Sequence, residues 1–266
     1  MFAALPKELQ HALDAAHAQL GGFTNVRYAD SIGSTNDAVM QLAAAGEPEG
    51  TAVCADQQTA GRGRRGRTWS SPAGAGVYLS VLLRGREFTS APGLSTLGAG
   101  VAAAAAVQAA TGLQVSLKWP NDLVIGERWQ KLGGILCEAH GSDALVIGLG
   151  LNITAAAHPP DVAFRATSVD AELGRPTDRW AIVVACLAAL GTLAAQLRAG
   201  RGPEVLQQWR RWAAPGWDNA AVRWTDADRE ARGTARDVDT DGALIVERDS
   251  RRERVIAGEV VWERHR

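Results

Sequence analysis

The chain has 266 residues, 46% of them are hydrophobic, and its formal net charge at pH 7 is −1. This length allows a sizeable core, and the apolar fraction is that of a globular protein and not of a disordered one. The near-neutral balance excludes a global field that would draw the chain to nucleic acid or to an anionic membrane, so any basic surface must be local.

Strand-like and helix-like segments are interspersed over most of the chain without a regular βαβ rhythm. In chain order, we predict a helix at residues 7–20, a strand at 26–30, a helix at 37–45 that Ser34, Thr35 or Asn36 caps, strands at 51–56 and 77–83, a helix at 94–111, strands at 114–119, 123–125, 133–138 and 144–149, and helices at 180–198 and 204–212. The pattern predicts an α+β fold in which helices pack on a mixed sheet. The last three strands are expected to form an antiparallel meander, and the strand at 77–83 to be buried on both faces.

The composition changes after Pro215-Gly216. Residues 219–266 read as short strands separated by charged turns, of which Asp241-Gly242 is a good hairpin turn. We therefore predict two domains, a larger one at 1–215 and a small β-barrel at 216–266.

The stretch 181–197 lies at the lower limit of length for a membrane-spanning helix. It is rich in alanine, which contributes little transfer energy, so we predict a buried core helix and no membrane partner. No signal-peptide pattern is evident at the N-terminus. Cys54, Cys137 and Cys186 are far apart, form no CxxC pair and are expected to be small buried hydrophobes. These features favour a reducing, cytoplasmic setting.

The most informative segment, here called the arginine loop, comprises residues 61–69 (GRGRRGRTW). Its glycines let the backbone turn freely and approach a ligand closely. Its arginines supply forked donors that suit phosphate and carboxylate, and Trp69 supplies a flat face that can cover a ring. This combination predicts a mobile lid over a small anionic ligand that carries an aromatic base.

Three other interpretations of the arginine loop are weaker. The spacing Gly61-x-Gly63-x-x-Gly66 matches the dinucleotide-binding fingerprint, but the residues that follow have turn chemistry instead of a helix start. A basic nucleic-acid patch and a solvated flexible loop also fit the composition. The neutral net charge and the lack of interleaved aromatic residues argue against nucleic acid.

A second segment, residues 118–122 (KWPND), combines a strand end with a stiff turn. Pro120 would make Lys118, Asn121 and Asp122 project in defined directions, where they suit a phosphate, a ribose, a water or Mg²⁺. Taken alone, a polar turn that bonds its own backbone explains the segment equally well.

Two glycine-containing segments follow. In 131–136 (KLGGIL), Lys131 precedes two glycines that allow a ligand or a neighbouring backbone to pass closely. In 148–152 (GLGLN), glycine alternates with leucine and the run ends in Asn152. A surface lysine and a plain turn asparagine are the alternatives when each segment is taken alone.

Other classes of site find no support in the sequence. The five histidines form no HExxH or paired-ligand spacing, so a catalytic zinc site is not expected. Neither a G-x-S-x-G elbow nor the GxxxxGK[ST] pattern occurs, which argues against an α/β-hydrolase and against a P-loop NTPase.

Taken together, the segments 34–36 (STN), 58–69 (QTAGRGRRGRTW), 118–122, 131–135 and 148–152 resemble biotin protein ligases in both order and spacing. The resemblance runs from about residue 28 to the C-terminus. It implies a catalytic domain similar to class II aminoacyl-tRNA synthetases and an SH3-like C-terminal barrel. It also implies a two-step reaction. Biotin and ATP-Mg²⁺ give biotinyl-5′-AMP and pyrophosphate, and a specific lysine of a biotin carboxyl carrier protein then attacks the acyl-adenylate and releases AMP.

The resemblance implies roles for individual residues. Lys131 and Arg64 are expected to be catalytic, with Lys131 at the reacting carboxyl and phosphate oxygens. Biotin binding is implied for Ser34, Thr35, Asn36, Gln58, Arg62, Gly63, Arg64 and Lys131. ATP binding is implied for Gly61, Arg64, Arg67, Trp69, Lys118, Asn121, Asp122 and Asn152. Mg²⁺ is expected to arrive with ATP, and no protein ligand is implied for it.

Bifunctional members of the family place a winged helix-turn-helix ahead of the catalytic domain. Only about 30 residues precede Ser34, so we expect a ligase without specific DNA binding. An exposed sheet edge is compatible with a monomer or a weak homodimer. The alternative functions are a lipoate or octanoate ligase of the same fold and a non-enzymatic nucleic-acid-binding module that uses the arginine loop.

Overall fold

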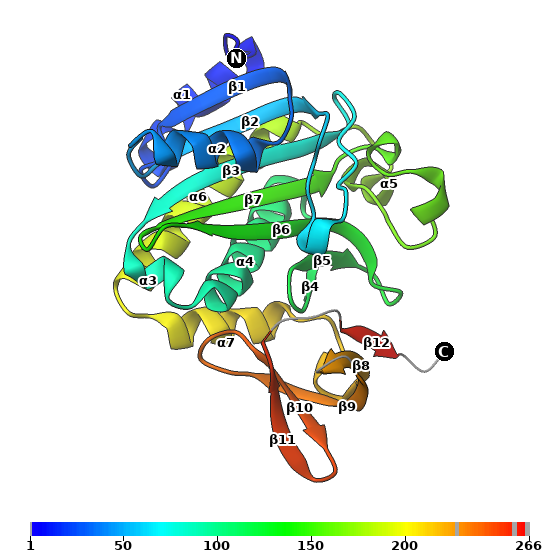
Figure 1. Ribbon diagram of the computed structural model, residues 1–266. Coiled ribbons are helices and arrows are strands. Elements are labelled where there is room, and N and C mark those ends of the chain that lie inside the picture. The colour runs from blue at the N-terminus through cyan, green and yellow to red at the C-terminus, as the bar shows by residue number, and fades with distance from the viewer. Residues whose placement is uncertain (1, 227–228, 257–259, 264–266) are drawn as a thin grey trace.

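The computed structural model describes residues 2–226, 229–256 and 260–263. Its larger sheet contains the strands β1 (Asn25–Ile32), β2 (Thr51–Gln58), β3 (Gly76–Arg84), β4 (Ser116–Lys118), β5 (Asp122–Ile125), β6 (Gln130–His140) and β7 (Ala144–Asn152). The strand order is β1-β2-β3-β7-β6-β5-β4 (Figure 1). The β1–β2 pair is parallel and all other neighbouring pairs are antiparallel, so the predicted mixed sheet is confirmed.

The helices are α1 (Lys7–Ala15), α2 (Thr35–Ala44), α3 (Arg86–Thr89), α4 (Pro92–Thr111), α5 (Val169–Leu173), α6 (Arg179–Arg198) and α7 (Gly202–Trp212). The predicted helix at 7–20 is shorter than expected, because α1 ends at Ala15 and a separate 3₁₀ turn follows at His17–Gln19. Ser34 occupies the N-cap position of α2, although its side chain makes no capping hydrogen bond.

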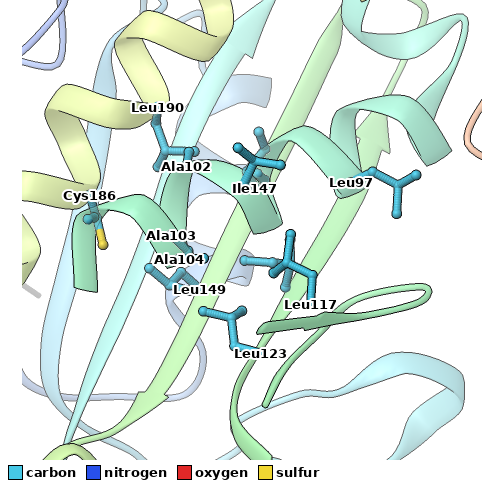
Figure 2. Close-up of a cluster of buried hydrophobic side chains, with 14 of the residues drawn as sticks. Leu97, Ala102, Ala103, Ala104, Leu117, Leu123, Ile147, Leu149, Cys186 and Leu190 are labelled. Carbon is cyan, nitrogen blue, oxygen red and sulfur yellow. The ribbon is translucent and has the colours of Figure 1, made fainter. Parts of the chain in front are cut away.

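Different helices cover the two faces of the larger sheet. On one face, alanines of α4 bring this helix close to the sheet and to α6, and Ala103, Leu149 and Cys186 lie in the packed layer between them (Figure 2). On the other face, α2 packs through Ala38 and Val39 in a second, smaller cluster of buried side chains. The candidate functional residues lie on the face of the sheet that α2 covers.

The meander predicted for β5, β6 and β7 is confirmed, and so is the burial of β3 on both faces. In β3, Leu79 and Val81 belong to the core under α4 and α6, while Leu82 belongs to the cluster under α2. A run without polar alternation therefore forms a strand because helices cover both of its sides.

A second sheet follows at the C-terminal end, with β8 (Ala221–Asp226), β9 (Arg229–Val238), β10 (Leu244–Arg248), β11 (Arg251–Val255) and β12 (Val261–Glu263). It is antiparallel throughout, and its order is β11-β10-β9-β8-β12. The predicted SH3-like barrel is not confirmed. Within the described part of this region, β11 and β12 are the two edges of an open sheet. The predicted division at residues 215 and 216 stays a prediction.

The turn predicted at Asp241-Gly242 does connect two strands, β9 and β10, and Gly242 has a φ of 84°. This turn packs against the first turn of α4, where a Cβ on Gly93 would collide with the Asp241 carbonyl. The buried Trp119 indole Nε1 also donates a hydrogen bond of 2.9 Å to the Gly242 carbonyl. The C-terminal sheet is thus held against the KWPND segment.

Among the described residues, α4 and α6 are both long and apolar enough to cross a membrane. More than half of each apolar stretch is buried within the protein, which is also the property of helices in a packed core. The predicted core helix at 181–197 corresponds to α6, whose residues Ile182, Leu187 and Leu190 belong to the main core.

Candidate functional site

A cavity of about 920 Å³ opens on the face of the sheet that carries α2. Its lining residues come from the N-terminus of α2 and from β5, β6 and β7. The arginine loop, which also lines it, extends from the end of β2 toward β5 (Figure 1). Of the residues predicted to bind or to react, all but Gly61 line this one cavity: Ser34, Thr35, Asn36, Gln58, Arg62, Gly63, Arg64, Arg67, Trp69, Lys118, Asn121, Asp122, Lys131 and Asn152. Segments that are far apart in the chain therefore meet at one place.

The floor of the cavity is made by the glycine–leucine alternation in β7. Leu149 and Leu151 point into the core beneath α4, so Gly148, Gly150 and Asn152 lie on the opposite face. A Cβ on Gly148 would overlap the Asn36 side chain, and a Cβ on Gly150 would lie 2.6 Å from the Trp69 indole Nε1. These glycines are required because polar and aromatic groups lie directly against the strand backbone.

At one end of the cavity, buried polar side chains hold one another in place. The Gln58 side-chain oxygen accepts hydrogen bonds from the backbone N–H of Thr35 (2.8 Å) and from its hydroxyl (3.1 Å). The Gln58 amide Nε2 donates to the Ser71 hydroxyl at 2.8 Å. Since all three side chains are at least partly buried, their orientations are set before any ligand enters.

Asn36 is the centre of a second network at this end. Its Oδ1 accepts a hydrogen bond of 2.6 Å from the buried hydroxyl of Ser80 on β3. Its Nδ2 donates to the Leu136 carbonyl at 3.2 Å and to Glu138 Oε2 at 2.7 Å. The predicted residue Asn36 is therefore held by Ser80 and Glu138, which sequence reasoning missed.

The arginine loop, which is predicted to act as a lid, folds as a short hairpin. Arg62 and Thr68 form an antiparallel bridge, the Gly63 N–H donates to the Arg67 carbonyl at 2.7 Å, and the Trp69 N–H donates to the Gly61 carbonyl at 2.9 Å. The tip is a 3₁₀ turn at Arg64–Gly66. Cross-loop backbone bonds define the shape of the hairpin.

Gly61 is not among the residues that line the cavity, and its predicted role at the ATP site stays a prediction. Its backbone runs beside Trp69 and Ser71, and a Cβ on it would lie 2.7 Å from the Ser71 hydroxyl and collide with the Trp69 carbonyl. The glycine is needed because the two arms of the hairpin approach closely at its base.

Arg62 is engaged by carboxylates. Its NH1 and NH2 groups donate to Glu138 Oε1 and Oε2 at 2.9 and 2.6 Å, and NH2 also lies 2.7 Å from Asp37 Oδ1. The bidentate geometry fixes the plane of the guanidinium. The resemblance implies a biotin-binding role for Arg62, and it did not indicate these two partners.

The other end of the cavity is strongly basic. The Lys131 ammonium lies 2.5 Å from Asp122 Oδ1, and the Lys118 ammonium lies 3.9 Å from Asp122 Oδ2. The hairpin pairing of Lys118 with Asp122 brings these residues together, and the β5–β6 pairing brings in Lys131. One carboxylate thus orients two ammonium groups toward the same space.

Arg64 reaches this basic end from the tip of the arginine loop. Its NH1 lies 3.4 Å from Asn121 Oδ1, a long hydrogen bond. Burial lowers the pKa of the Arg64 guanidinium below its ordinary value, while the nearby Asp122 carboxylate opposes that shift. A cation that has lost part of its hydration gains most from an anionic ligand.

Asn121 and Asn152 shape the backbone of this end. The Asn121 Nδ2 donates to the Ile135 carbonyl at 2.8 Å. The buried Asn152 donates from its Nδ2 to the Thr167 carbonyl at 3.0 Å and to the Lys131 carbonyl at 3.4 Å. Both asparagines hold strands and loops around Lys131.

Several residues of the cavity wall have no counterpart in the sequence predictions. The indoles of Trp129, from the β5–β6 turn, and Trp262, from β12, meet edge to face with ring centroids 5.6 Å apart. His158 and Phe164, from the segment before α5, complete the wall. Two of these four lie in stretches without a recognisable motif, and Trp262 reaches the site only through the C-terminal sheet.

The three cysteines are free, and Cys54 and Cys186 are buried as predicted. Cys137 on β6 is only partly buried, a small departure from the prediction. Burial raises the pKa of each thiol from 9.0 to about 12, so all three are protonated near neutrality. Within the described residues, no group of three or more His, Cys, Asp and Glu side chains is arranged to hold a metal ion.

Comparison with known proteins identifies the family. Residues 28–152 match the Biotin/lipoate A/B protein ligase family, and residues 219–262 match the Biotin protein ligase C terminal domain. The Biotin--[acetyl-CoA-carboxylase] ligase of Mycobacterium tuberculosis is 34% identical over 246 residues, which cover 90% of each chain.

Other relatives are longer. The Bifunctional ligase/repressor BirA of Bacillus spizizenii is 37% identical over 162 residues, which are 59% of this chain and 49% of that protein. The match therefore spans about half the length of this bifunctional relative.

Among solved structures, the biotin protein ligase from Aquifex aeolicus in complex with biotin and ATP superposes with a TM-score of 0.79 and 26% identity. The superposition covers 91% of this chain and 99% of that one. With the matching domains, the M. tuberculosis relative and the polar cavity in the same fold, this chain belongs to the biotin protein ligase family.

Proposed function

We propose that this protein activates biotin with ATP to form biotinyl-5′-AMP and then transfers biotin to a specific lysine of a biotin carboxyl carrier protein. The observation that carries the proposal is the charge of the cavity. Eight arginine and lysine side chains and a single carboxylate, Asp122, are among its described lining residues, in a chain whose formal net charge is −1. A cavity of this charge is suited to a ligand with a carboxylate and phosphates.

The two ends of the cavity suit the two substrates. The end with Thr35, Asn36 and Gln58 offers neutral donors and acceptors in fixed orientations, which suit the ureido ring of biotin. The end with Lys118, Lys131 and Arg64 offers cations, which suit the nucleotide phosphates. The biotin carboxylate would lie between the two ends, next to Lys131.

The chemistry of the first step follows from this arrangement. The biotin carboxylate attacks the α-phosphorus of ATP, and pyrophosphate leaves, so negative charge builds up between two anions that repel each other. Lys131 and Arg64 would stabilise that charge, and Asp122 holds the Lys131 ammonium in position for it. In the second step, the acceptor lysine attacks the acyl carbon and AMP leaves.

Mg²⁺ would enter this site with the nucleotide. Asp122 already contacts Lys131 at 2.5 Å, and the structure's described residues supply no cluster of carboxylates around it. Mg²⁺ is commonly bound through one or two carboxylates together with substrate phosphates and water, so this donor set fits a metal that ATP brings. The residue that would contribute a ligand is Asp122.

The acceptor would be the carrier domain of a biotin-dependent carboxylase. The support is the M. tuberculosis relative, which is a biotin--[acetyl-CoA-carboxylase] ligase. We also extend the proposal to an SH3-like arrangement of the C-terminal sheet, supported by the match of residues 219–262 to the family's C-terminal domain.

Biotin-dependent exchange of labelled pyrophosphate into ATP tests the activity, with lipoate and octanoate as controls. We expect exchange with biotin and none with the other two acids. Exchange with lipoate or octanoate and none with biotin would show that biotin is not the acid substrate. No exchange with any of the three acids would contradict the adenylation chemistry itself.

A further inference from the structure

Glu138 on β6 connects the arginine loop to the buried floor of the site. Its Oε2 accepts from Asn36 Nδ2 at 2.7 Å, and its two oxygens accept the Arg62 fork at 2.6 and 2.9 Å. Asn36 in turn is held by the fully buried Ser80 hydroxyl. One carboxylate therefore joins a rigid strand, the first turn of α2 and the base of a hairpin loop.

This contact differs from an ordinary surface ion pair. Exposed pairs with one contact contribute about 0–1 kcal/mol, because water screens them and side-chain entropy opposes them. The Glu138 side chain is only 24% exposed, its pair with Arg62 is bidentate, and Asp37 adds a second carboxylate at 2.7 Å. Bidentate and networked pairs are the ones whose geometry is strongly specified.

Because Arg62 lies at the base of the arginine loop, its contact with Glu138 affects the position of the loop. Arg62 pairs with Thr68 across the base of the hairpin, next to the Gly63–Arg67 and Trp69–Gly61 backbone bonds. At the tip, Arg64 contacts Asn121 at 3.4 Å, which is a weak hydrogen bond. The base thus carries backbone bonds across the hairpin as well as the Arg62 pair, in which Glu138 (2.6 Å) lies slightly nearer than Asp37 (2.7 Å).

We propose that Glu138 is a positioning residue that anchors the arginine loop through Arg62 and thereby keeps the acyl-adenylate in the cavity. Glu138 does not line the cavity and so acts through Arg62. The Arg62 guanidinium, which contacts the carboxylates of Glu138 and Asp37, holds the base of the loop in place. Arg64 and Lys131 contact the anionic ligand. The part of this proposal that concerns the adenylate rests on the proposed function.

The anchoring is tested without any ligand by amide hydrogen exchange of the native protein. In Glu138→Gln, which keeps the side-chain size and removes the charge, the amides of Gly63 and Trp69 should exchange faster, by about tenfold when a charge-assisted pair is lost. Glu47→Gln is the matched control, since Glu47 is a similarly buried carboxylate (28% exposed) that pairs with Arg27 at 2.6 Å, away from the loop. Unchanged protection of both loop amides in Glu138→Gln would overturn the proposal.

The consequence for the reaction is tested by the fate of the intermediate. With biotin and ATP but no carrier protein, Glu138→Gln should release several times more biotinyl-5′-AMP into solution per pyrophosphate formed than the wild type or Glu47→Gln. Glu138→Asp, which keeps the charge, should recover part of the retention. A variant that only binds biotin more weakly and retains the adenylate as the wild type does would overturn the proposal, because Glu138 would then act through Asn36 alone.

A double-mutant cycle separates the Glu138–Arg62 contact from general damage. If both side chains act through one contact, Arg62→Met with Glu138→Gln should release no more adenylate than the more affected single variant. Additive effects would overturn the proposal.

If Glu138→Gln folds poorly, Arg62→Lys at the exposed end of the pair removes the bidentate geometry and should give the same increase in amide exchange of the loop. Should the wild type fail to adenylate biotin, the proposed function fails, while the amide exchange still decides whether Glu138 anchors the loop.

Discussion

The indole of Trp69 lies directly on the backbone of Gly150, so that a Cβ on this glycine would come within 2.6 Å of the indole Nε1. Two positions earlier on the same strand, Gly148 supports the side chain of Asn36 in the same way. One strand therefore carries two contact points, one at each end of the cavity, and each tolerates no side chain.

Substitution of these two glycines should affect the two substrates differently. Gly150→Ala should displace Trp69 and raise the KM for ATP, and Gly148→Ala should displace Asn36 and raise the KM for biotin. Overpacking costs about 1–3 kcal/mol, so each affected KM should rise by roughly tenfold. Steady-state pyrophosphate exchange with each substrate varied in turn measures both effects. Equal changes of both KM values in both variants would contradict the separation of the two ends.

Arg64→Ala should slow formation of the adenylate and let it escape into solution. Arg64 is a partly buried cation at the tip of the loop, close to Asn121 and Asp122. Its loss removes a donor from the nucleotide phosphate and a contact that closes the cavity. Chromatographic measurement of free biotinyl-5′-AMP tests this, with Arg232→Ala, a solvent-exposed arginine of the C-terminal sheet, as the control. Normal retention of the adenylate in Arg64→Ala would exclude the lid role.

Lys131→Ala should lose most of the adenylation activity. Loss of one strong transition-state donor costs on the order of 10²–10³ in rate. The variant also leaves Asp122 without its partner at 2.5 Å, so uncompensated negative charge would face the phosphates. Single-turnover formation of the adenylate is the measurement, and Lys7→Ala, on the exposed side of α1, is the control. Near-normal turnover would remove Lys131 from the reacting centre.

The three thiols should be unreactive in the native protein. Burial raises the pKa of Cys54, Cys137 and Cys186 from 9.0 to about 12, so at pH 8 almost no thiolate is present in the fold. Titration with a disulfide reagent should give three fast-reacting thiols in denaturant and none under native conditions. One fast thiol in the native protein would most directly implicate the partly buried Cys137.

The same shifts set a direction for stability at high pH. A group whose pKa is higher in the fold than in the unfolded chain stabilises the fold fully below the unfolded value. This contribution is lost as the pH rises from about 9 toward 12, because the unfolded chain releases its thiol protons first. Replacement of the buried Cys186 by alanine should reduce the pH dependence of the melting temperature in that range, and an unchanged slope would contradict the assignment.

The main sheet, the motifs of the site and the family could be predicted from the amino-acid sequence. The glycine–leucine alternation at 148–152, the KWPND turn and the arginine loop each have a local chemical pattern, and local pattern is what a sequence displays directly. The mixed sheet, the buried β3 and the β5–β6–β7 meander also followed from apolar runs and turn residues. A resemblance carried by several spaced motifs then indicated the family.

The tertiary structure decided what those residues contact. Ser80 and Glu138 are single polar residues inside strands, and a lone polar residue in an apolar run is the only signal that marks them in sequence. The pairing of Arg62 with Glu138 joins residues 76 positions apart, and it depends on strand register and side-chain direction. For the same reason the arginine loop forms a hairpin, Gly61 lies against Trp69, and Trp262 reaches the site from the second sheet. Motifs predict chemistry because they are local, whereas the partners that orient and neutralise each group are set by packing over the whole chain.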